Sequence, residues 1–138
     1  MLRISTALAF LALAASAKAD TLVVAPTPVH AVYGQSIRVD YTGILDGAGT
    51  LYATVFTYVQ PGRRACARTQ LLESNRPASE QLHMFARGLA GPFLVRLRME
   101  GFTPGLYRLC AYLQHTATTE DRPDALATAL VRVQKSQR

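Results

Sequence analysis

The chain has 138 residues, of which 49% are hydrophobic and 17% charged, and 15 Lys and Arg against 9 Asp and Glu give a formal net charge of +6. This length allows a single domain, and the composition excludes a disordered polyelectrolyte. The modest positive charge permits association with anionic polymers without requiring it.

The first 19 residues have the pattern of a cleaved secretion signal. Arg3 precedes a short apolar segment at residues 8–15, and Ala17-Lys18-Ala19 then provides a small-x-small cleavage motif. The uncharged run of residues 4–17 is shorter than the roughly 20 residues that a spanning helix needs. We therefore predict one mature domain over residues 20–138, exported to the periplasm or the medium of a bacterium, with no transmembrane segment.

The mature part reads as short strands separated by glycines and prolines. The expected strands are residues 21–25 with a continuation at 29–33, then 36–41, 51–59, 66–72, 92–99, 106–114 and 125–133. Turns are expected at 43–49, 60–62 and 103–105, and a polar loop at 116–124.

Alternation of apolar and polar residues is clearest in two of these strands. In residues 36–41, Ile37, Val39 and Tyr41 alternate with charged residues. In residues 92–99, one face carries Phe93, Val95, Leu97 and Met99, and the other carries Leu94, Arg96 and Arg98. Burying two unpaired guanidinium groups costs more than exposing one leucine, so we expect Arg96 and Arg98 on the outer face.

Residues 78–89 fit two different periods. Leu82, Phe85, Ala86 and Leu89 have the spacing of a short helix near residues 79–89, whereas Leu82, Met84 and Ala86 also fit a strand. Both interpretations stay open at this point. About seven short strands in one domain indicate an all-β fold, a two-sheet antiparallel sandwich.

The stretch Pro104-Gly105-Leu106-Tyr107-Arg108-Leu109-Cys110 and the three residues after it carry a family resemblance. This stretch resembles the penultimate strand of immunoglobulin-like and fibronectin-like sandwiches, which often begins Pro-Gly-x-Tyr and in immunoglobulins carries the second Cys. With an upstream Cys and a signal, the chain is also similar to small exported bacterial proteins of unassigned function. Tyr107 precedes Cys110 by three residues rather than two, and the chain has no Trp. The resemblance therefore implies an immunoglobulin-like architecture, without the disulfide topology and without a ligand site.

Cys66 and Cys110 are the only two cysteines. In an oxidising compartment we expect them to form a disulfide, which would stabilise the fold by about 4 kcal/mol on the chain-entropy model. The chain contains no C-x-x-C motif, and His30, His83 and His115 show no zinc-ligand spacing relative to the cysteines.

The sequence contains no recognisable catalytic, phosphate-binding or dinucleotide-binding motif. His83-Met84 with Met99 is a slight indication of a copper site, but Met84 and Met99 fit the core better. We expect no enzyme activity, no cofactor and no metal.

Two groups of residues are candidates for contact with a partner. The first is the aromatic row Tyr52, Phe56 and Tyr58 of residues 51–59; it is exposed if the aliphatic row faces the core, unless neighbouring strands or a loop cover it or the rings themselves form the core. The second is basic: Arg63, Arg64 and Arg68 lie close together on one loop and the strand expected after it, and Arg96 and Arg98 lie on one strand face, where Arg108 is a candidate to join. We expect this face and the loop to act together on one partner. These arginines either bind an acidic envelope component or are solvated outer-face residues that protect an edge strand.

The resulting functional hypothesis is an exported non-catalytic module that binds a protein or an anionic glycan at the cell envelope or outside the cell. The alternatives are an inhibitor or envelope-stability factor and a small hydrolase with an unrecognised site. Nucleic acid is not expected as a partner, because the basic residues are not interleaved with exposed aromatics. The sequence carries no signal for an oligomeric state.

Overall fold

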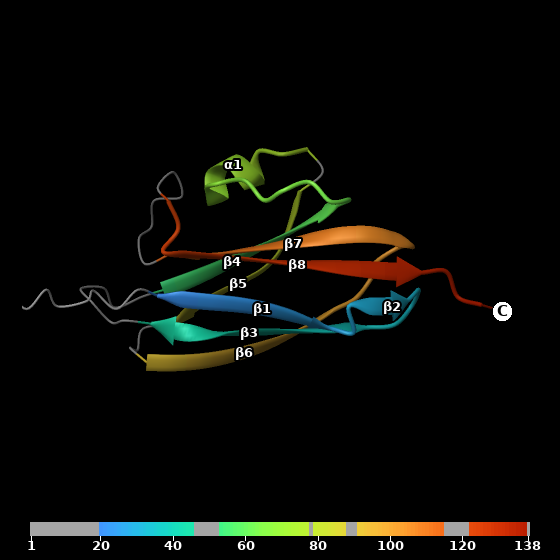
Figure 1. The fold of residues 1–138 in the computed structure, drawn as a ribbon, viewed down its shortest axis with the longest axis horizontal. Helices are drawn as coiled ribbons and strands as arrows, with labels where there is room; N and C mark the ends of the chain where they lie inside the picture. Colours follow the sequence, from blue (N-terminus) through green and yellow to red (C-terminus); the bar gives the residue numbers. More distant parts are fainter. Residues whose placement is uncertain (1–19, 46–52, 78, 88–90, 115–121, 138) are drawn as a thin grey trace, which may run out of the picture.

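The computed structural model describes residues 20–45, 53–77, 79–87, 91–114 and 122–137. They form two stacked sheets, one with the strand order β1-β3-β6 and one with the order β2-β8-β7-β4-β5 (Figure 1). The strands are β1 (Thr21–Thr27), β2 (His30–Val32), β3 (Ile37–Leu45), β4 (Ala53–Pro61), β5 (Glu80–Arg87), β6 (Gly91–Met99), β7 (Gly105–Gln114) and β8 (Ala125–Gln134). Apart from the parallel pairing of β2 with β8, neighbouring strands are antiparallel, so the predicted two-sheet β-sandwich is confirmed.

The strand predicted over residues 66–72 is wrong. Residues 66–69 form a loop that leads into the short helix α1 (Gln70–Ser74). Thr69 caps this helix, because its side-chain oxygen accepts a hydrogen bond from the Leu72 backbone N–H at 3.3 Å. The segment thus lies outside both sheets.

The open choice at residues 78–89 is resolved as a strand, β5, which pairs with β4 from Val59↔Glu80 to Ala53↔Arg87. The predicted turn at residues 43–49 is wrong at its start, because β3 continues to Leu45 and Gly43 pairs with strands on both sides. A Cβ atom at Gly43 would lie 1.9 Å from the Thr21 carbonyl oxygen, so this close strand contact requires glycine. Residues 46–52 and most of the predicted 116–124 loop lie outside the described residues.

The core lies between the two sheets. Val39, Val55, Leu109 and Val131 are fully buried there, and Phe93 and Met99 are 5% exposed. Val95 and Leu97 pack against this core, whereas the side chains of Leu94, Arg96 and Arg98 are exposed. The faces predicted for β6 and the core position predicted for Met99 are therefore confirmed.

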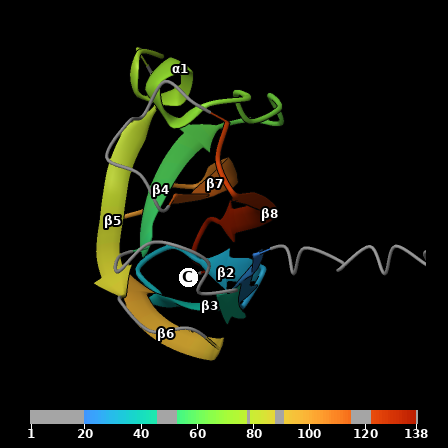
Figure 2. The same cartoon turned by 90° about the vertical axis from the view of Figure 1, so that its left-hand side faces the viewer.

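Residues 62–77 cross the outer face of the five-stranded sheet, on the side away from β6 (Figures 1 and 2). Beneath this segment, Tyr58, Cys110 and Tyr112 form a second buried cluster, separate from the main core. The segment therefore converts part of an outer sheet face into an interior.

Candidate functional site

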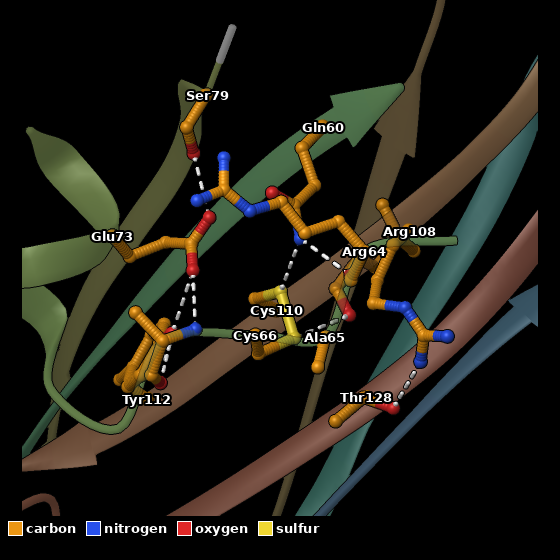
Figure 3. The surroundings of a disulfide bond; sticks show 12 residues. Gln60, Arg64, Ala65, Cys66, Glu73, Ser79, Arg108, Cys110, Tyr112 and Thr128 are labelled. Carbon is orange, nitrogen blue, oxygen red and sulfur yellow. Dashed lines mark hydrogen bonds between the residues drawn. A yellow bond between two sulfur atoms is a disulfide. The ribbon is translucent and has the colours of Figure 1, made fainter. Parts of the chain in front are cut away.

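Residues 62–77, which we call the covering segment, are joined to the sheet by the disulfide between Cys66 and Cys110. The Cα atoms of the two cysteines are 5.7 Å apart (Figure 3). Cys110 is fully buried on β7, and Cys66 is half-buried in the loop. Because the disulfide joins two residues that are 44 positions apart in sequence, it fixes where the loop lies on the sheet.

The backbone just before Cys66 is held by a series of hydrogen bonds to the sheet and to the segment itself. The Gly62 backbone N–H donates to the Leu106 carbonyl at 2.6 Å. Three consecutive carbonyl oxygens then accept from side chains: Arg63 from Arg108 Nη2 at 3.2 Å, Arg64 from Gln60 Nε2 at 2.9 Å and Ala65 from Arg76 Nη1 at 2.7 Å. The side chains of Arg63 and Arg64 are exposed, so a fixed backbone presents two arginines to solvent.

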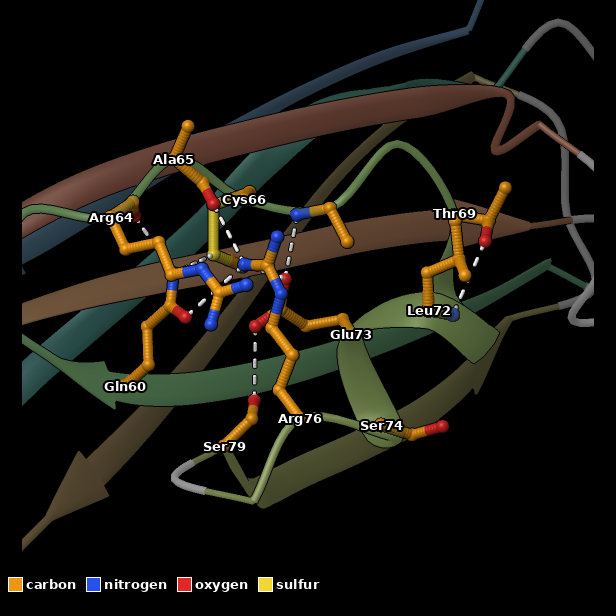
Figure 4. Close-up of polar contacts among 12 residues, drawn as sticks. Gln60, Arg64, Ala65, Cys66, Thr69, Leu72, Glu73, Ser74, Arg76 and Ser79 are labelled. Carbon is orange, nitrogen blue, oxygen red and sulfur yellow. Dashed lines mark hydrogen bonds and ion pairs between the residues drawn. A yellow bond between two sulfur atoms is a disulfide. The ribbon is translucent and has the colours of Figure 1, made fainter.

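Glu73 of α1 is the buried anchor of the segment (Figure 4). Its Oε2 accepts from the Ala67 backbone N–H at 2.7 Å and from Arg76 Nη1 at 3.1 Å, and its Oε1 accepts from Ser79 Oγ at 3.1 Å. Both carboxylate oxygens are therefore partnered, which compensates the cost of burying the charge.

Tyr112 on β7 contacts the same carboxylate from the side of the five-stranded sheet. Its hydroxyl group lies 2.7 Å from the Ala67 carbonyl and 3.1 Å from Glu73 Oε2, so its one proton is shared between two acceptors. Burial and the adjacent negative charge of Glu73 raise the pKa of Tyr112 far above its usual range. Tyr112 consequently remains a neutral donor to Glu73 at every physiological pH.

Two surface hollows flank the exposed arginines. One, of about 550 Å³, is lined by Arg64, Cys66, Ala67, Arg68, Leu72 and Arg76. The other, of about 270 Å³, is lined by Val29, His30, Arg63, Leu106, Leu130 and Arg132. Neither lining includes an acidic residue, so both hollows are basic. We call them the helix hollow and the strand hollow, respectively.

The candidate aromatic row is not exposed at Tyr58, which is 2% exposed because residues 62–77 cover it. Gln70 Nε2 donates to its hydroxyl, and burial raises its pKa above the usual value. Phe56 is half-buried against the Tyr58 and Tyr112 cluster, and Tyr52 lies outside the described residues. Of the alternatives left open for this row, the structure therefore shows cover by a loop at Tyr58.

The predicted joining of all the arginines into one basic surface is also wrong. Arg96 and Arg98 lie on β6 of the three-stranded sheet, on the opposite side of the sandwich from Arg63, Arg64 and Arg68. Arg96 Nε and Arg38 Nε lie 3.6 and 3.3 Å from Asp40 Oδ1, which are ion-pair rather than hydrogen-bond contacts. Arg108 lies with the Arg63 loop instead, donating to Thr128 Oγ1 at 3.2 Å as well as to the Arg63 carbonyl.

The sequence interpretation missed Glu73 and Arg76, which organise the segment. Glu73 lies in α1 and Arg76 follows its C-cap Asn75, so the pair forms only because the chain turns directly after the short helix. Within the described residues, no three or more His, Cys, Asp and Glu side chains are placed to hold a metal ion, and His30 is exposed. His115 and the side chains of His83 and Met84 lie outside the described residues. Among the residues that the structure describes, no helix combines the length and hydropathy needed to cross a membrane.

A scan against family models finds no match to this chain, and a search of curated proteins finds none either. The crystal structure of a CARDB domain from Pyrococcus furiosus, in complex with di-metal ions, superimposes with a TM-score of 0.57 at 14% identity, over 85% of this chain and 94% of that chain. The fold resembles that of a CARDB domain. This likeness confirms the expected immunoglobulin-like sandwich.

Parts of larger proteins of different activity also superimpose on this chain. A β-glucosidase from Listeria innocua, in complex with gluconolactone, matches with a TM-score of 0.57 at 18% identity, over 83% of this chain and 16% of the enzyme. An alkylpurine DNA glycosylase from Pseudomonas fluorescens, bound to DNA with an abasic site analogue, matches with a TM-score of 0.51 at 14% identity, over 83% of this chain and 29% of that protein. These likenesses concern the fold alone.

Proposed function

We propose that this protein is an exported, non-catalytic binding module that contacts an anionic protein or glycan through residues 63–68, the arginine segment. The observation that carries the proposal is the fixed backbone beneath exposed guanidinium groups. The carbonyls of Arg63, Arg64 and Ala65 are each held by a side chain, and the Cys66–Cys110 disulfide follows at once. A binding loop that is already ordered loses less conformational entropy when its partner binds.

The chemistry of the arginine segment favours an anionic partner. Arg63, Arg64 and Arg68 are exposed, and Arg76 and Arg132 line the two hollows beside them. Glu73, the nearby acid, already makes hydrogen bonds through both of its oxygens. Guanidinium groups bind phosphate, sulfate and carboxylate through paired hydrogen bonds, so an oxyanion is the ligand chemistry that this surface fits.

Two observations support location at the cell envelope or outside the cell. The order of charged, apolar and small residues before Asp20 is that of a secretion signal. The paired cysteines suit an oxidising compartment. A CARDB-like sandwich is consistent with a binding role and no catalysis of its own.

The test compares two variants with equal loss of charge. Arg64→Gln/Arg68→Gln changes the arginine segment, and Arg96→Gln/Arg98→Gln changes the opposite sheet. Binding is measured to anionic cell-wall material and to a sulfated polysaccharide at low and high salt. We expect the first variant to lose at least about tenfold in affinity, since each charge-assisted hydrogen bond contributes about 1.5–3 kcal/mol, and the second to bind as the wild type.

Equal losses in the two variants would show that net charge alone, rather than the arginine segment, attracts these polymers. An unchanged affinity in Arg64→Gln/Arg68→Gln would remove the proposal. Unfolding in urea, measured for both variants, confirms that the exposed substitutions leave the fold intact.

A further inference from the structure

The helix hollow and the strand hollow lie on the two sides of a single short backbone stretch. Arg63 lines the strand hollow and Arg64, its neighbour in sequence, lines the helix hollow. The backbone between them is held at both carbonyl groups, by Arg108 and by Gln60. Residues 63 and 64, whose side chains line one hollow each and whose backbone is fixed, are called the ridge.

The two hollows have similar chemistry although they are built from different elements. The strand hollow combines Arg63 and Arg132 with the aliphatic side chains of Leu106 and Leu130. The helix hollow combines Arg64, Arg68 and Arg76 with Leu72, which is 46% exposed. Each hollow therefore offers guanidinium donors beside an apolar wall, the surroundings that an anionic group attached to a carbon or sugar backbone needs.

Arg76 gives the helix hollow a positioned donor. Among the described residues, its hydrogen bonds to Gln60, Ala65 and Glu73 all run through Nη1. The guanidinium is thus held by one nitrogen, and its side chain is 19% exposed. The remaining N–H groups are available to a ligand without rearrangement of the buried contacts.

We propose that the two hollows are paired subsites for one linear polyanion, which crosses the ridge at Arg63 and Arg64 and places anionic groups on both sides. This inference rests on the proposed function and adds the length and form of the ligand to it. A single small anion occupies one hollow, whereas a polymer chain occupies both, and the second contact is intramolecular. Joining two weak sites in this way raises the overall affinity without any new contact.

The experiment uses two series of probes with the purified protein: orthophosphate, tripolyphosphate and long-chain polyphosphate, and in parallel inorganic sulfate and dextran sulfate. Affinities are measured by calorimetry at fixed ionic strength and expressed per anionic group. The proposal expects the long chains to bind at least about 100-fold more tightly than the single anions. The phosphate and sulfate series distinguish the two kinds of anionic group.

One exposed arginine in each hollow allows the two subsites to be tested separately. Arg68→Gln changes the helix hollow and Arg132→Gln changes the strand hollow, and neither side chain makes a hydrogen bond or ion pair to another described residue. We expect each single variant to lose most of the preference for long chains while still binding single anions at the other hollow. The matched control Arg96→Gln/Arg98→Gln keeps the full preference.

Three outcomes would overturn the inference: no preference for long chains in the wild type, a full preference in either single variant, or an equal loss in the control. If the wild type shows no preference for long chains but binds single anions, and Arg64→Gln/Arg68→Gln abolishes that binding, the proposed function stands. Only the inference of paired subsites for a polymer is then rejected. If no anion binds the wild type, both proposals fail.

Discussion

Arg76 Nη1 lies 3.1 Å from Glu73 Oε2, and this ion pair joins a fully buried carboxylate to a guanidinium that reaches the surface. Through the same Nη1, Arg76 also donates to the Ala65 carbonyl. The pair therefore couples the interior of the covering segment to the arginine segment that we propose as the binding surface.

Removal of the Glu73 charge is expected to destabilise the protein. In Glu73→Gln the Ala67 N–H and Arg76 lose a charged acceptor inside the covering segment. We expect a loss of about 3 kcal/mol in the free energy of unfolding, because breaking one partner of a buried pair leaves the other uncompensated and Arg76 retains some hydration. Urea unfolding followed by circular dichroism measures this loss.

Glu100→Gln is the matched control, because Glu100 is an exposed carboxylate in the loop before β7. Its substitution is expected to change stability by less than about 0.5 kcal/mol. Equal effects of the two substitutions would contradict a structural role for the Glu73 charge.

The disulfide is expected to stabilise the fold and to hold the covering segment in place. Cys66→Ala/Cys110→Ala should lower the free energy of unfolding by about 2–5 kcal/mol, the usual cost of losing a native disulfide in a small domain. Peptide mapping without reductant should recover Cys66 joined to Cys110. Two freely alkylated thiols in the native protein would contradict the bond.

Alkaline pH is expected to weaken the fold through its buried tyrosines. Burial in the core raises the pKa of Tyr41 from 10.0 to about 12, and the hydrogen bond from Thr57 opposes this only in part. Between these two pH values the folded protein holds a proton that the unfolded chain releases, so stability falls as pH rises. Between these pH values one such group lowers the free energy of unfolding by about 1.4 kcal/mol per pH unit. Below about pH 10 it causes no change of stability with pH.

Urea midpoints measured across this alkaline range, with ultraviolet titration of tyrosinate, test the prediction. Burial shifts Tyr58 and Tyr112 in the same direction, so their effects add to that of Tyr41. Tyr41→Phe should show a shallower decline than the wild type. An identical decline in the two proteins would assign the alkaline loss to other groups.

Two leucines test the placement of the core. Leu109 on β7 is fully buried, whereas Leu94 on β6 is 50% exposed. Leu109→Ala should cost about 2–5 kcal/mol, through lost burial and the cavity left behind. Leu94→Ala should stay within about 0.5 kcal/mol of the wild type, and a larger loss would show that a partner or second copy covers this face.

Export predicts a defined N-terminus. Intact-mass measurement on protein from its native host should place the first residue at Asp20, directly after the Ala17-Lys18-Ala19 motif. A membrane-bound species that retains Met1 would contradict cleavage and the predicted location.

The sequence by itself determined which side of a strand faces the core wherever apolar and charged residues alternate. Ile37, Val39 and Tyr41 on β3, and Phe93 to Met99 on β6, needed no knowledge of their neighbours, because successive side chains of a strand point to opposite faces. The cysteine pair was likewise predictable, since the chain offers one pairing.

Only the tertiary structure decided what lies over each face. Residues 78–89 fit both periods, and pairing with β4 made them a strand. Alternation left open whether Tyr58 is exposed or covered, and a segment fixed by contacts with β7 covers it. Arg96 lies on β6 of the three-stranded sheet, whereas Arg64 lies in the segment that crosses the outer face of the five-stranded sheet, so the two arginines are on opposite surfaces. These outcomes depend on contacts between residues far apart in sequence, which local periodicity does not encode.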